Sequence, residues 1–251
     1  MNKEFLDFSS HLAEISGKII KQYFRTEISI DSKSDLSPVT IADKKSEEIM
    51  REEIQKHFPD HGIIGEEFGN YNTDAENVWV LDPIDGTKSF ICGAPTFGTL
   101  IALMKNNEPV LGVINQPVLK EFLIGDNYKT RLNGKEVMVR GCNRIEDAVL
   151  ITGDHFNIGK FQDQQRFDEL AKRVKLYRHW GDCFGYYLLA TGFADIIVDP
   201  IMSVWDSMAL IPIIKGAGGI ITDYQGSDPV TGNSIVAASP GIHSDIIRAL
   251  N

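Results

Sequence analysis

Acidic side chains placed where strands end and helices begin are the residues of this sequence best suited to chemistry. Two of them, Asp82 and Asp85, are three residues apart in the sequence Asp-Pro-Ile-Asp-Gly-Thr. The apolar run at residues 78–81 predicts a buried strand that leads into this pair. Because Pro83 cannot donate a ladder hydrogen bond, we expect the strand to end at Asp82. Both carboxylates are therefore expected at the rim of a sheet.

The residues that follow this pair predict a turn into a helix. Gly86 permits a tight turn, and Thr87 is a good helix N-cap. The free backbone N–H groups at the start of a helix bind anions such as phosphate, and carboxylate oxygens bind Mg²⁺. The segment therefore suits a divalent cation placed beside a phosphate group.

Two further acidic residues extend this set. Glu66 follows the short apolar strand expected at residues 63–65, and Asp206 lies at the start of a helix expected from Trp205. Packed together with the first pair, these carboxylates would repel one another unless cations lay between them. They supply enough oxygens for two Mg²⁺ ions, and two metals can stabilise both the attacking and the leaving oxygen of a phosphoryl displacement.

The nucleophile is expected to be water. Near the turn, the sequence offers no Ser or Cys paired with a histidine base. Thr87 is suited to orient such a water, and Asp43 is our candidate for orienting Thr87. Asp43 is also explained as an ordinary acidic residue in the first turn of a helix, stabilised by the helix dipole. Both interpretations stay open.

Two alternatives were weighed against a metal-dependent phosphatase. Aspartyl-nucleophile phosphatases of the haloacid dehalogenase type use two acids that are two residues apart, whereas here the spacing is three and a proline intervenes. A catalytically silent metal-binding scaffold is the non-enzymatic alternative. It is disfavoured because the sequence supplies both candidate metal ligands and candidate residues to orient a water.

Composition limits the partners. The 251 residues carry a net charge of −10, which argues against nucleic acid and against anionic lipid as partners. The acidity suits a cationic substrate or divalent metal, and equally suits solubility alone. The three cysteines are far apart and predict no zinc site, and no run of apolar residues is long enough to span a membrane. We expect a cytoplasmic protein, with all six histidines structural or exposed.

Periodicity predicts two halves, residues 1–145 and 146–251. The first half begins with a helix that ends near Arg25, a loop at 29–40, and a second helix capped by Thr40 with Ile41, Ile49 and Ile54 on its inner side. A polar loop is expected at 69–77. Antiparallel strands are then expected at 97–104, 109–115, 121–124, 128–132 and 137–139, with a hairpin turn at Asn133-Gly134 between the last two. In the second half, strands (148–152, 175–178, 194–198, 220–222, 234–238) alternate with helices (161–172, 183–191, 205–216 and one from 241).

The motifs Gly65-Glu66-Glu67, Asp82-Pro83-Ile84-Asp85-Gly86-Thr87 and Trp205-Asp206 occur in this order. Together they resemble the inositol monophosphatase family of Mg²⁺-dependent, lithium-sensitive phosphatases, over nearly the whole chain. The resemblance implies an α/β (α+β) fold, a layered α-β-α-β-α sandwich that usually forms a homodimer and acts on a small phosphorylated substrate.

The resemblance also implies a role for each residue. Glu66, Asp82 and the Ile84 carbonyl would hold one Mg²⁺, and Asp82, Asp85 and Asp206 a second. Glu66 and Thr87, with Asp43 behind Thr87, would activate the water, and the N–H groups of Gly86 and Thr87 would bind the phosphate. The loop around Lys33 resembles the mobile segment that the family closes over a third, weaker metal.

Other residues point to one branch of the family. Lys88-Ser89 after the turn and Trp180-Gly181-Asp182-Cys183 resemble the histidinol-phosphate phosphatases, which act late in histidine synthesis. Asp182 and Asp199 stand where the family contacts its leaving alcohol, although Asp199 replaces a usual Glu and Asp182 could instead be a helix N-cap. Inositol 1-phosphate, sugar phosphates, fructose 1,6-bisphosphate and phosphoadenosine phosphate remain alternative substrates.

Overall fold

The computed structural model describes residues 3–27, 29–32 and 38–251. Its chain begins with α1 (Lys3–Tyr23), an amphipathic helix that buries Phe8, Leu12 and Ile20. The helix ends close to the predicted position. The expectation for Lys33 lies outside the described residues.

Residues 29–40, which were predicted to be a loop, contain two short strands. Strand β1 (Ile30–Ser32) pairs antiparallel with β2 (Pro38–Thr40), so that Ile30 is opposite Thr40. The loop prediction was therefore wrong at both ends of this segment. Strands of three residues carry too little periodicity to be predicted.

Helix α2 (Ile41–His57) begins at the predicted cap, Thr40. The prediction of its inner side was wrong in part, because Ile41 is 41% exposed and Ile49 is only half-buried. The buried face instead carries Ala42, Asp43, Ser46, Glu47, Met50 and Ile54. Among the polar residues of this face, Glu47 holds a loop of the site and Asp43 caps the helix itself, as described below.

Eight strands form the larger sheet, in the order β10-β9-β8-β7-β6-β5-β3-β4. All neighbouring strands run antiparallel except β3 and β5, which are parallel. The strands are β3 (Gly62–Gly65), β4 (Gly69–Tyr71), β5 (Asn77–Asp85), β6 (Gly98–Lys105), β7 (Glu108–Gln116), β8 (Glu121–Gly125), β9 (Thr130–Leu132) and β10 (Lys135–Val137). The predicted antiparallel series is confirmed, and the loop predicted at 69–77 is corrected by β4. The predicted hairpin forms at Asn133 and Gly134, both with positive φ.

Five strands form the second sheet, in the order β12-β11-β13-β15-β14. They are β11 (Val149–Ile151), β12 (Leu176–Arg178), β13 (Ile196–Asp199), β14 (Ile220–Thr222) and β15 (Ile235–Ala238). The larger sheet thus lies within residues 62–137 and the smaller within 149–238, while the division of the chain at residue 145 stays a prediction.

The later helices alternate with these strands, as predicted, but with more breaks. They are α4 (His155–Phe161), α5 (Gln164–Arg173), α6 (Asp182–Ala190), α7 (Val204–Ser207), α8 (Leu210–Gly216) and α9 (His243–Leu250). Helix α4 was not predicted, and the helix predicted at 205–216 is divided into α7 and α8. Among the described residues, no helix combines the length and the apolar character that a membrane span requires.

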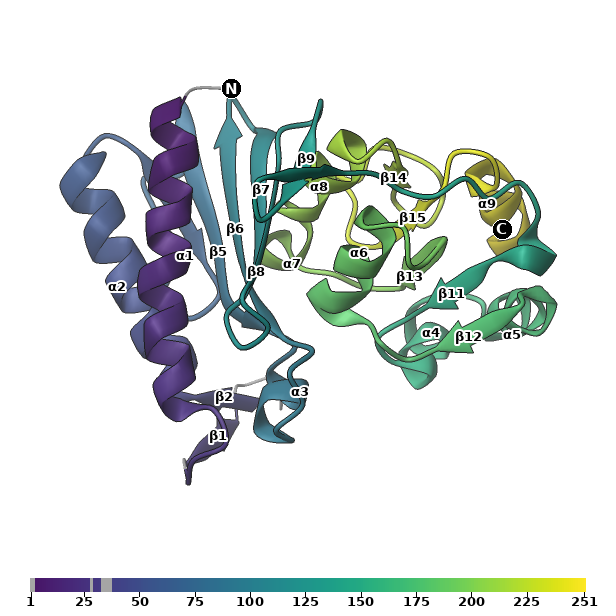
Figure 1. The fold of residues 1–251 in the computed structure, drawn as a ribbon, viewed down its shortest axis with the longest axis horizontal. Helices are drawn as coiled ribbons and strands as arrows, with labels where there is room; N and C mark the ends of the chain where they lie inside the picture. The colour runs from purple at the N-terminus through teal and green to yellow at the C-terminus, as the bar shows by residue number, and fades with distance from the viewer. Residues whose placement is uncertain (1–2, 28, 33–37) are drawn as a thin grey trace.

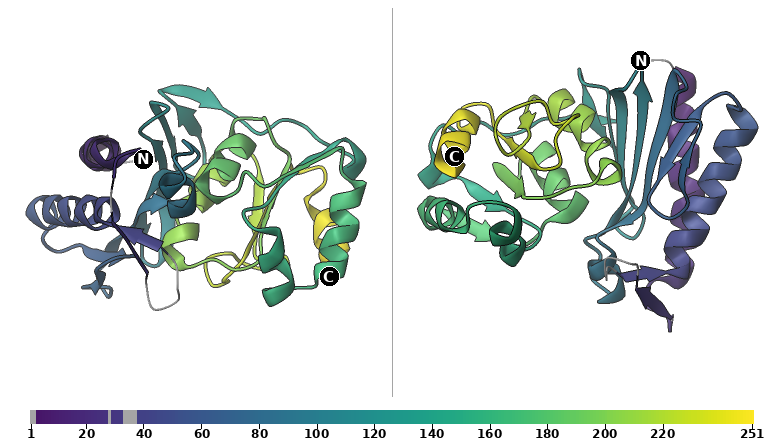
Figure 2. Two further views of the ribbon diagram at one scale, coloured as in Figure 1. Left: turned by 90° about the horizontal axis from the view of Figure 1, so that it is seen from below. Right: turned by 180° about the vertical axis from the view of Figure 1, so that it is seen from behind.

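The elements stack in five layers (Figures 1 and 2). Helices α1 and α2 cover one face of the larger sheet, and α6 and α8 lie between the two sheets. Helices α5 and α9 cover the far face of the smaller sheet. The predicted α-β-α-β-α sandwich is confirmed. Apolar clusters fill the spaces between these layers.

Candidate active site

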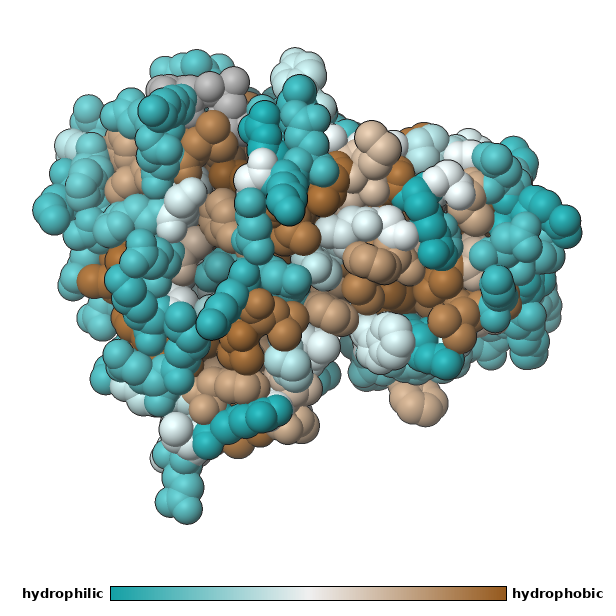
Figure 3. Space-filling view, in the orientation of Figure 1, coloured by the Kyte–Doolittle hydropathy of each residue, from teal (hydrophilic) through white to brown (hydrophobic). Residues whose placement is uncertain are grey.

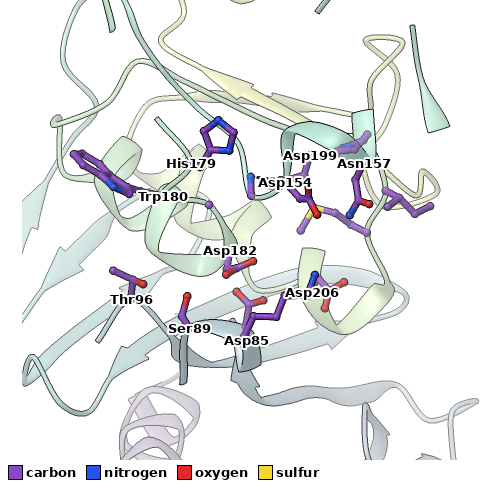
Figure 4. Close-up of a pocket in the computed structure, with 16 residues that line it drawn as sticks. Asp85, Ser89, Thr96, Asp154, Asn157, His179, Trp180, Asp182, Asp199 and Asp206 are labelled. Carbon is purple, nitrogen blue, oxygen red and sulfur yellow. Dashed lines mark hydrogen bonds between the residues drawn. The ribbon is translucent and has the colours of Figure 1, made fainter. Parts of the chain in front are cut away.

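Three carboxylates from distant parts of the chain meet at one end of the central layer. Within the part of the chain that the structure describes, Asp82, Asp85 and Asp206 each offer an oxygen, and these oxygens lie within 4.8 Å of one another. The first two are on β5, and Asp206 is in α7. Figure 4 shows Asp85 and Asp206 side by side at the floor of a pocket. The expectation that Asp206 joins the Asp82–Asp85 corner is confirmed.

Strand β5 bends to bring its two carboxylates together. The strand continues through Pro83 to Asp85, so the prediction that it ends at Asp82 was wrong. The pairing register with β6 shifts between Asp82 and Asp85, which is a bulge that accommodates the proline. The Thr99 hydroxyl donates to the Pro83 carbonyl (2.9 Å), and the Ile84 N–H donates to Oδ1 of Asp82 (3.0 Å). These bonds fix the bend.

The helix after β5 begins one residue earlier than predicted. Gly86, with φ 85°, is the N-cap residue of α3 (Thr87–Ile91), and Thr87 is the first helical residue rather than the cap. A Cβ on Gly86 would lie 3.0 Å from Oδ2 of Asp182, so the position needs both a positive φ and close approach. Figure 1 shows α3 where β5 ends, at the lower edge of the sheet.

Asp43 and Thr87 have different partners in this structure. Asp43 completes the capping box of α2, because its Oδ2 accepts from the N–H (2.9 Å) and the hydroxyl of Thr40. The Thr87 hydroxyl donates to the carbonyl of Ile84 (3.0 Å). Burial raises the pKa of Asp43 to about 6. Among the described residues, no donor lies within hydrogen-bond distance of its buried Oδ1.

Glu66 is placed by a buried glutamate that the sequence reasoning missed. Glu47, on α2, accepts from the N–H groups of Glu67 (2.7 Å) and Phe68 (3.1 Å), and it pairs with Arg51 (2.9 Å). This fixes the turn that begins at Glu66, directly after β3. The signal was available, since Glu47 is a charged residue on a helix face that also carries Ala42, Met50 and Ile54.

The electrostatics of the cluster favour bound cations. Burial, followed by the charges of Glu66, Asp85 and Asp206, raises the pKa of Asp82 well above its usual range. Burial, followed by the charges of Asp182 and Asp206, does the same for Asp85. Burial also raises the pKa of Asp206 to about 7. Buried carboxylates that repel one another in an all-oxygen donor set fit hard divalent cations.

The first turn of α6 forms the opposite wall. Its N-cap is Gly181, so the alternative interpretation of Asp182 as an N-cap is wrong. Asp182 is the first helical residue, with φ 53°. Burial raises the pKa of Asp182, and the charge of Lys88 acts in the opposite direction. The N–H of Cys183, next in the helix, donates to the Asp85 carboxylate.

Asp199 closes the site at the end of β13. Its Oδ2 accepts from the Tyr186 hydroxyl (2.8 Å), and its Oδ1 accepts from the Gly153 N–H (3.4 Å). Burial raises the pKa of Asp199 to about 6, although the Tyr186 hydroxyl lowers it. Both of its oxygens are therefore held within the wall of the pocket.

A pocket of about 300 Å³ joins these parts. Besides Asp85, Asp182, Asp199 and Asp206, its lining includes Lys88, Ser89, Thr96, Asp154, Asn157, His179, Trp180 and Met202. Figure 4 shows that His179 and Trp180 come from the segment just before α6. The pocket thus has an acidic floor and, at one end, an aromatic wall.

Comparison with known proteins identifies the family. The sequence model described as the inositol monophosphatase family matches residues 1–251. The chain belongs to this family.

Individual relatives agree with this assignment. The chain is 41% identical to the bifunctional phosphatase IMPL2, chloroplastic, of Arabidopsis thaliana, over 98% of this chain and 75% of that protein. It is 37% identical to a histidinol-phosphatase of Chlorobaculum parvum, over 98% of this chain and 96% of that protein. An inositol monophosphatase from Zymomonas mobilis superposes with a TM-score of 0.89 at 36% identity, covering 99% of this chain and 98% of that chain.

Membership of the inositol monophosphatase family establishes the chemistry. The protein is a phosphatase that hydrolyses phosphomonoesters of small molecules, in a family that is metal-dependent. The acidic cluster at the end of β5 is where the chain offers oxygen ligands together.

Three further residues line the pocket of this inositol monophosphatase family member without having been predicted to do so. His179, expected to be structural or exposed, is exposed; it also lines the pocket, with its ring 4.9 Å from that of Tyr177, centroid to centroid. Trp180 lines the pocket while 49% exposed. Lys88, on α3, also lines the pocket. For His179 and Trp180, the position next to Gly181 and Asp182 was the available signal.

Proposed function

We propose that this protein hydrolyses histidinol phosphate to histidinol and phosphate, using Mg²⁺. The observation that carries the proposal is the wall beyond the carboxylate cluster, where Asp182 and Asp199 line the same pocket as Trp180. Histidinol carries an ammonium group and an imidazole, so these half-buried carboxylates and an aromatic ring suit it. The name of the Chlorobaculum parvum relative supports the same substrate.

We assign the metal ligands as follows. Glu66, Asp82 and the Ile84 carbonyl would hold one Mg²⁺, and Asp82, Asp85 and Asp206 would hold a second. Two ions, or three with a weaker site, would lower the pKa of the attacking water and neutralise charge on the phosphoryl oxygens. The donor set supports this assignment because it consists of oxygens alone, with Asp82 buried and Asp85 and Asp206 half-buried.

The chain's own residues then position the reactants. Glu66 and Thr87 orient the attacking water, and Asp43 accepts a hydrogen bond from the Thr87 hydroxyl once that hydroxyl has turned away from the Ile84 carbonyl. The Asp43 Oδ1 atom, which has no donor among the described residues, is available for that role. The N–H groups of Gly86 and Thr87 bind the phosphate. Asp182 and Asp199 hold the leaving alcohol at the far side of the pocket.

Inositol 1-phosphate is the second candidate substrate, because the Zymomonas mobilis neighbour is named an inositol monophosphatase. Its alcohol is neutral and hydroxyl-rich, so carboxylates can accept its hydrogen bonds as well.

The deciding experiment compares kcat/KM of the purified enzyme for histidinol phosphate and for inositol 1-phosphate. We expect the higher value for histidinol phosphate. A higher value for inositol 1-phosphate would overturn the substrate and leave the phosphatase chemistry in place.

We also propose that the enzyme is a homodimer. Figure 3 shows apolar side chains gathered over α6 on one face of the molecule. Beyond the end of α6, Phe193 is 66% exposed and Met138 is 74% exposed. A Cβ on Gly192 would lie 3.2 Å from the Met138 carbonyl, so these segments are adjacent. Exposed apolar residues of this kind mark interfaces.

Light scattering tests the proposed homodimer. It should give a dimer for the wild type and a monomer for Phe193→Glu; a monomeric wild type would contradict the proposal.

A further inference from the structure

We propose that Tyr186 is a positioning residue for Asp199, holding its carboxylate in the orientation that receives the ammonium group of the leaving alcohol. The inference rests on the proposed function, since it takes Asp199 as a contact of that alcohol. It adds a residue that would touch neither the substrate nor the metal.

Tyr186 lies behind the pocket wall. Its side chain is fully buried in the core between the two sheets. Its hydroxyl donates to Oδ2 of Asp199 at 2.8 Å and lies 3.4 Å from the sulfur of Met202. A tyrosine in an apolar core costs free energy unless its hydroxyl finds a partner, so this bond is maintained in the folded protein.

The second restraint on Asp199 is weaker. The Gly153 N–H lies 3.4 Å from Oδ1 of Asp199, which is long for a hydrogen bond. Asp199 is also the last residue of β13, so the strand does not restrain its backbone on the C-terminal side. The hydroxyl of Tyr186 is therefore the main restraint on the rotation of this carboxylate.

The orientation that Tyr186 maintains places Asp199 opposite Asp182. A Cβ built on Gly153 would lie 3.5 Å from Oδ1 of Asp199 and 3.6 Å from Oδ1 of Asp182. Both oxygens thus face the same small space above a residue that has no side chain. An ammonium group in this space would contact both carboxylates, and charge-assisted hydrogen bonds of this kind depend strongly on geometry.

The test uses Tyr186→Phe, which keeps the ring and removes only the hydroxyl. Tyr187→Phe is the matched control, because Tyr187 is the next residue of α6 and its hydroxyl bonds to Glu121 instead. We expect KM for histidinol phosphate to rise about tenfold in Tyr186→Phe, with kcat within about twofold, because a hydrogen bond to a charged group is lost. Tyr187→Phe should behave like the wild type. An unchanged KM, or an equal loss in kcat, would overturn the inference.

A double-mutant cycle shows whether Tyr186 acts through Asp199. If it does, Tyr186→Phe combined with Asp199→Asn should raise KM no further than Asp199→Asn alone. If the fold increases in KM of the two single variants multiply in the double variant, the inference is overturned, because Tyr186 would then act independently of Asp199. Thermal melting of every variant checks that each one folds.

The two proposals fail in different ways. A wild type that prefers inositol 1-phosphate contradicts the proposed substrate. The same cycle, run with inositol 1-phosphate, then tests Tyr186 by itself. If Tyr186→Phe raises only KM, and does so in the wild type but not in Asp199→Asn, its positioning role is supported. If the increases in KM of the two substitutions combine in full, that role is overturned.

Discussion

The backbone N–H of Cys183 donates a hydrogen bond to the carboxylate of Asp85. The bond joins the first turn of α6, which packs against the smaller sheet, to the end of β5 in the larger sheet. The carboxylate cluster is therefore assembled across the layer between the sheets, and its geometry depends on how the two sheets pack together.

The thiol of Cys183 contributes little to this link, because its sulfur lies 3.8 Å from the Asp85 carbonyl and a thiol is a weak donor. We expect Cys183→Ala to keep kcat/KM within about twofold and to lose about 1 kcal/mol of stability from the small cavity. Steady-state kinetics and urea unfolding measure the two effects. A large loss of kcat/KM in a folded variant would show that the thiol itself is needed.

Bound Mg²⁺ should stabilise the fold. A cation that binds only the folded state stabilises it by about 2.7 kcal/mol at 100 times Kd. We expect the melting temperature to rise with Mg²⁺, and to rise less in Asp206→Asn, which offers one anionic ligand fewer. Without metal, Asp206→Asn should melt no lower than the wild type, because a repelling charge is gone. Identical Mg²⁺ shifts in the two proteins would contradict the role of Asp206.

The metal-free protein should lose stability as the pH rises. Burial raises the pKa of Asp206 to about 7 and that of Asp199 to about 6. The folded protein therefore keeps protons that the unfolded chain, with carboxyl pKa values of about 4, has released. The contribution of these groups is fully present below about pH 4 and is lost as the pH rises toward 7.

Urea unfolding in EDTA measures this effect. We expect the free energy of unfolding to fall between about pH 5 and pH 7.5, and to fall less in Asp206→Asn. Saturating Mg²⁺ should reduce the fall, because the cation binds the ionised carboxylates. A metal-free wild type that grows more stable across this range would contradict the raised pKa values.

The bulge in β5 should depend on Thr99. Thr99→Val keeps the shape of the side chain and leaves the buried Pro83 carbonyl without its donor at 2.9 Å. We expect a loss of about 1–3 kcal/mol in stability, with weaker Mg²⁺ binding because Asp82 and Asp85 flank the bulge. Thr26→Val, at an exposed hydroxyl that bonds Tyr23, is the control. Equal effects of the two substitutions would show that the bulge does not need this bond.

Much of the fold was predictable because its signals are local. The periodicity of α1, the cap at Thr40 and the turn at Asn133-Gly134 each depend on a few neighbouring residues, and the structure confirms them. Strands β1, β2 and β4 were missed because strands of three residues give no period. The extension of β5 through Pro83 was missed because the bulge depends on Thr99, a residue of the neighbouring strand.

As with the fold, part of the site could be predicted from the sequence. Asp82, Asp85 and Asp206 were found because each follows or begins an element, and because their order matches a family motif. Glu47 and Tyr186 were not found. The charge of Glu47 on a helix face that also carries apolar residues was a signal, but the hydrogen-bond partners that give both residues their roles depend on the tertiary structure. Residues that hold others in place carry no motif of their own, so tertiary structure is needed to identify them.

The most direct test of the account measures phosphate release from histidinol phosphate by the wild-type enzyme, first in EDTA and then as Mg²⁺ is restored. We expect no turnover in EDTA and full recovery with Mg²⁺, since the carboxylate oxygens of Asp82, Asp85 and Asp206 would hold the cations. Folded Asp82→Asn should stay inactive at every Mg²⁺ concentration. Phosphate release that is indifferent to EDTA would contradict the account.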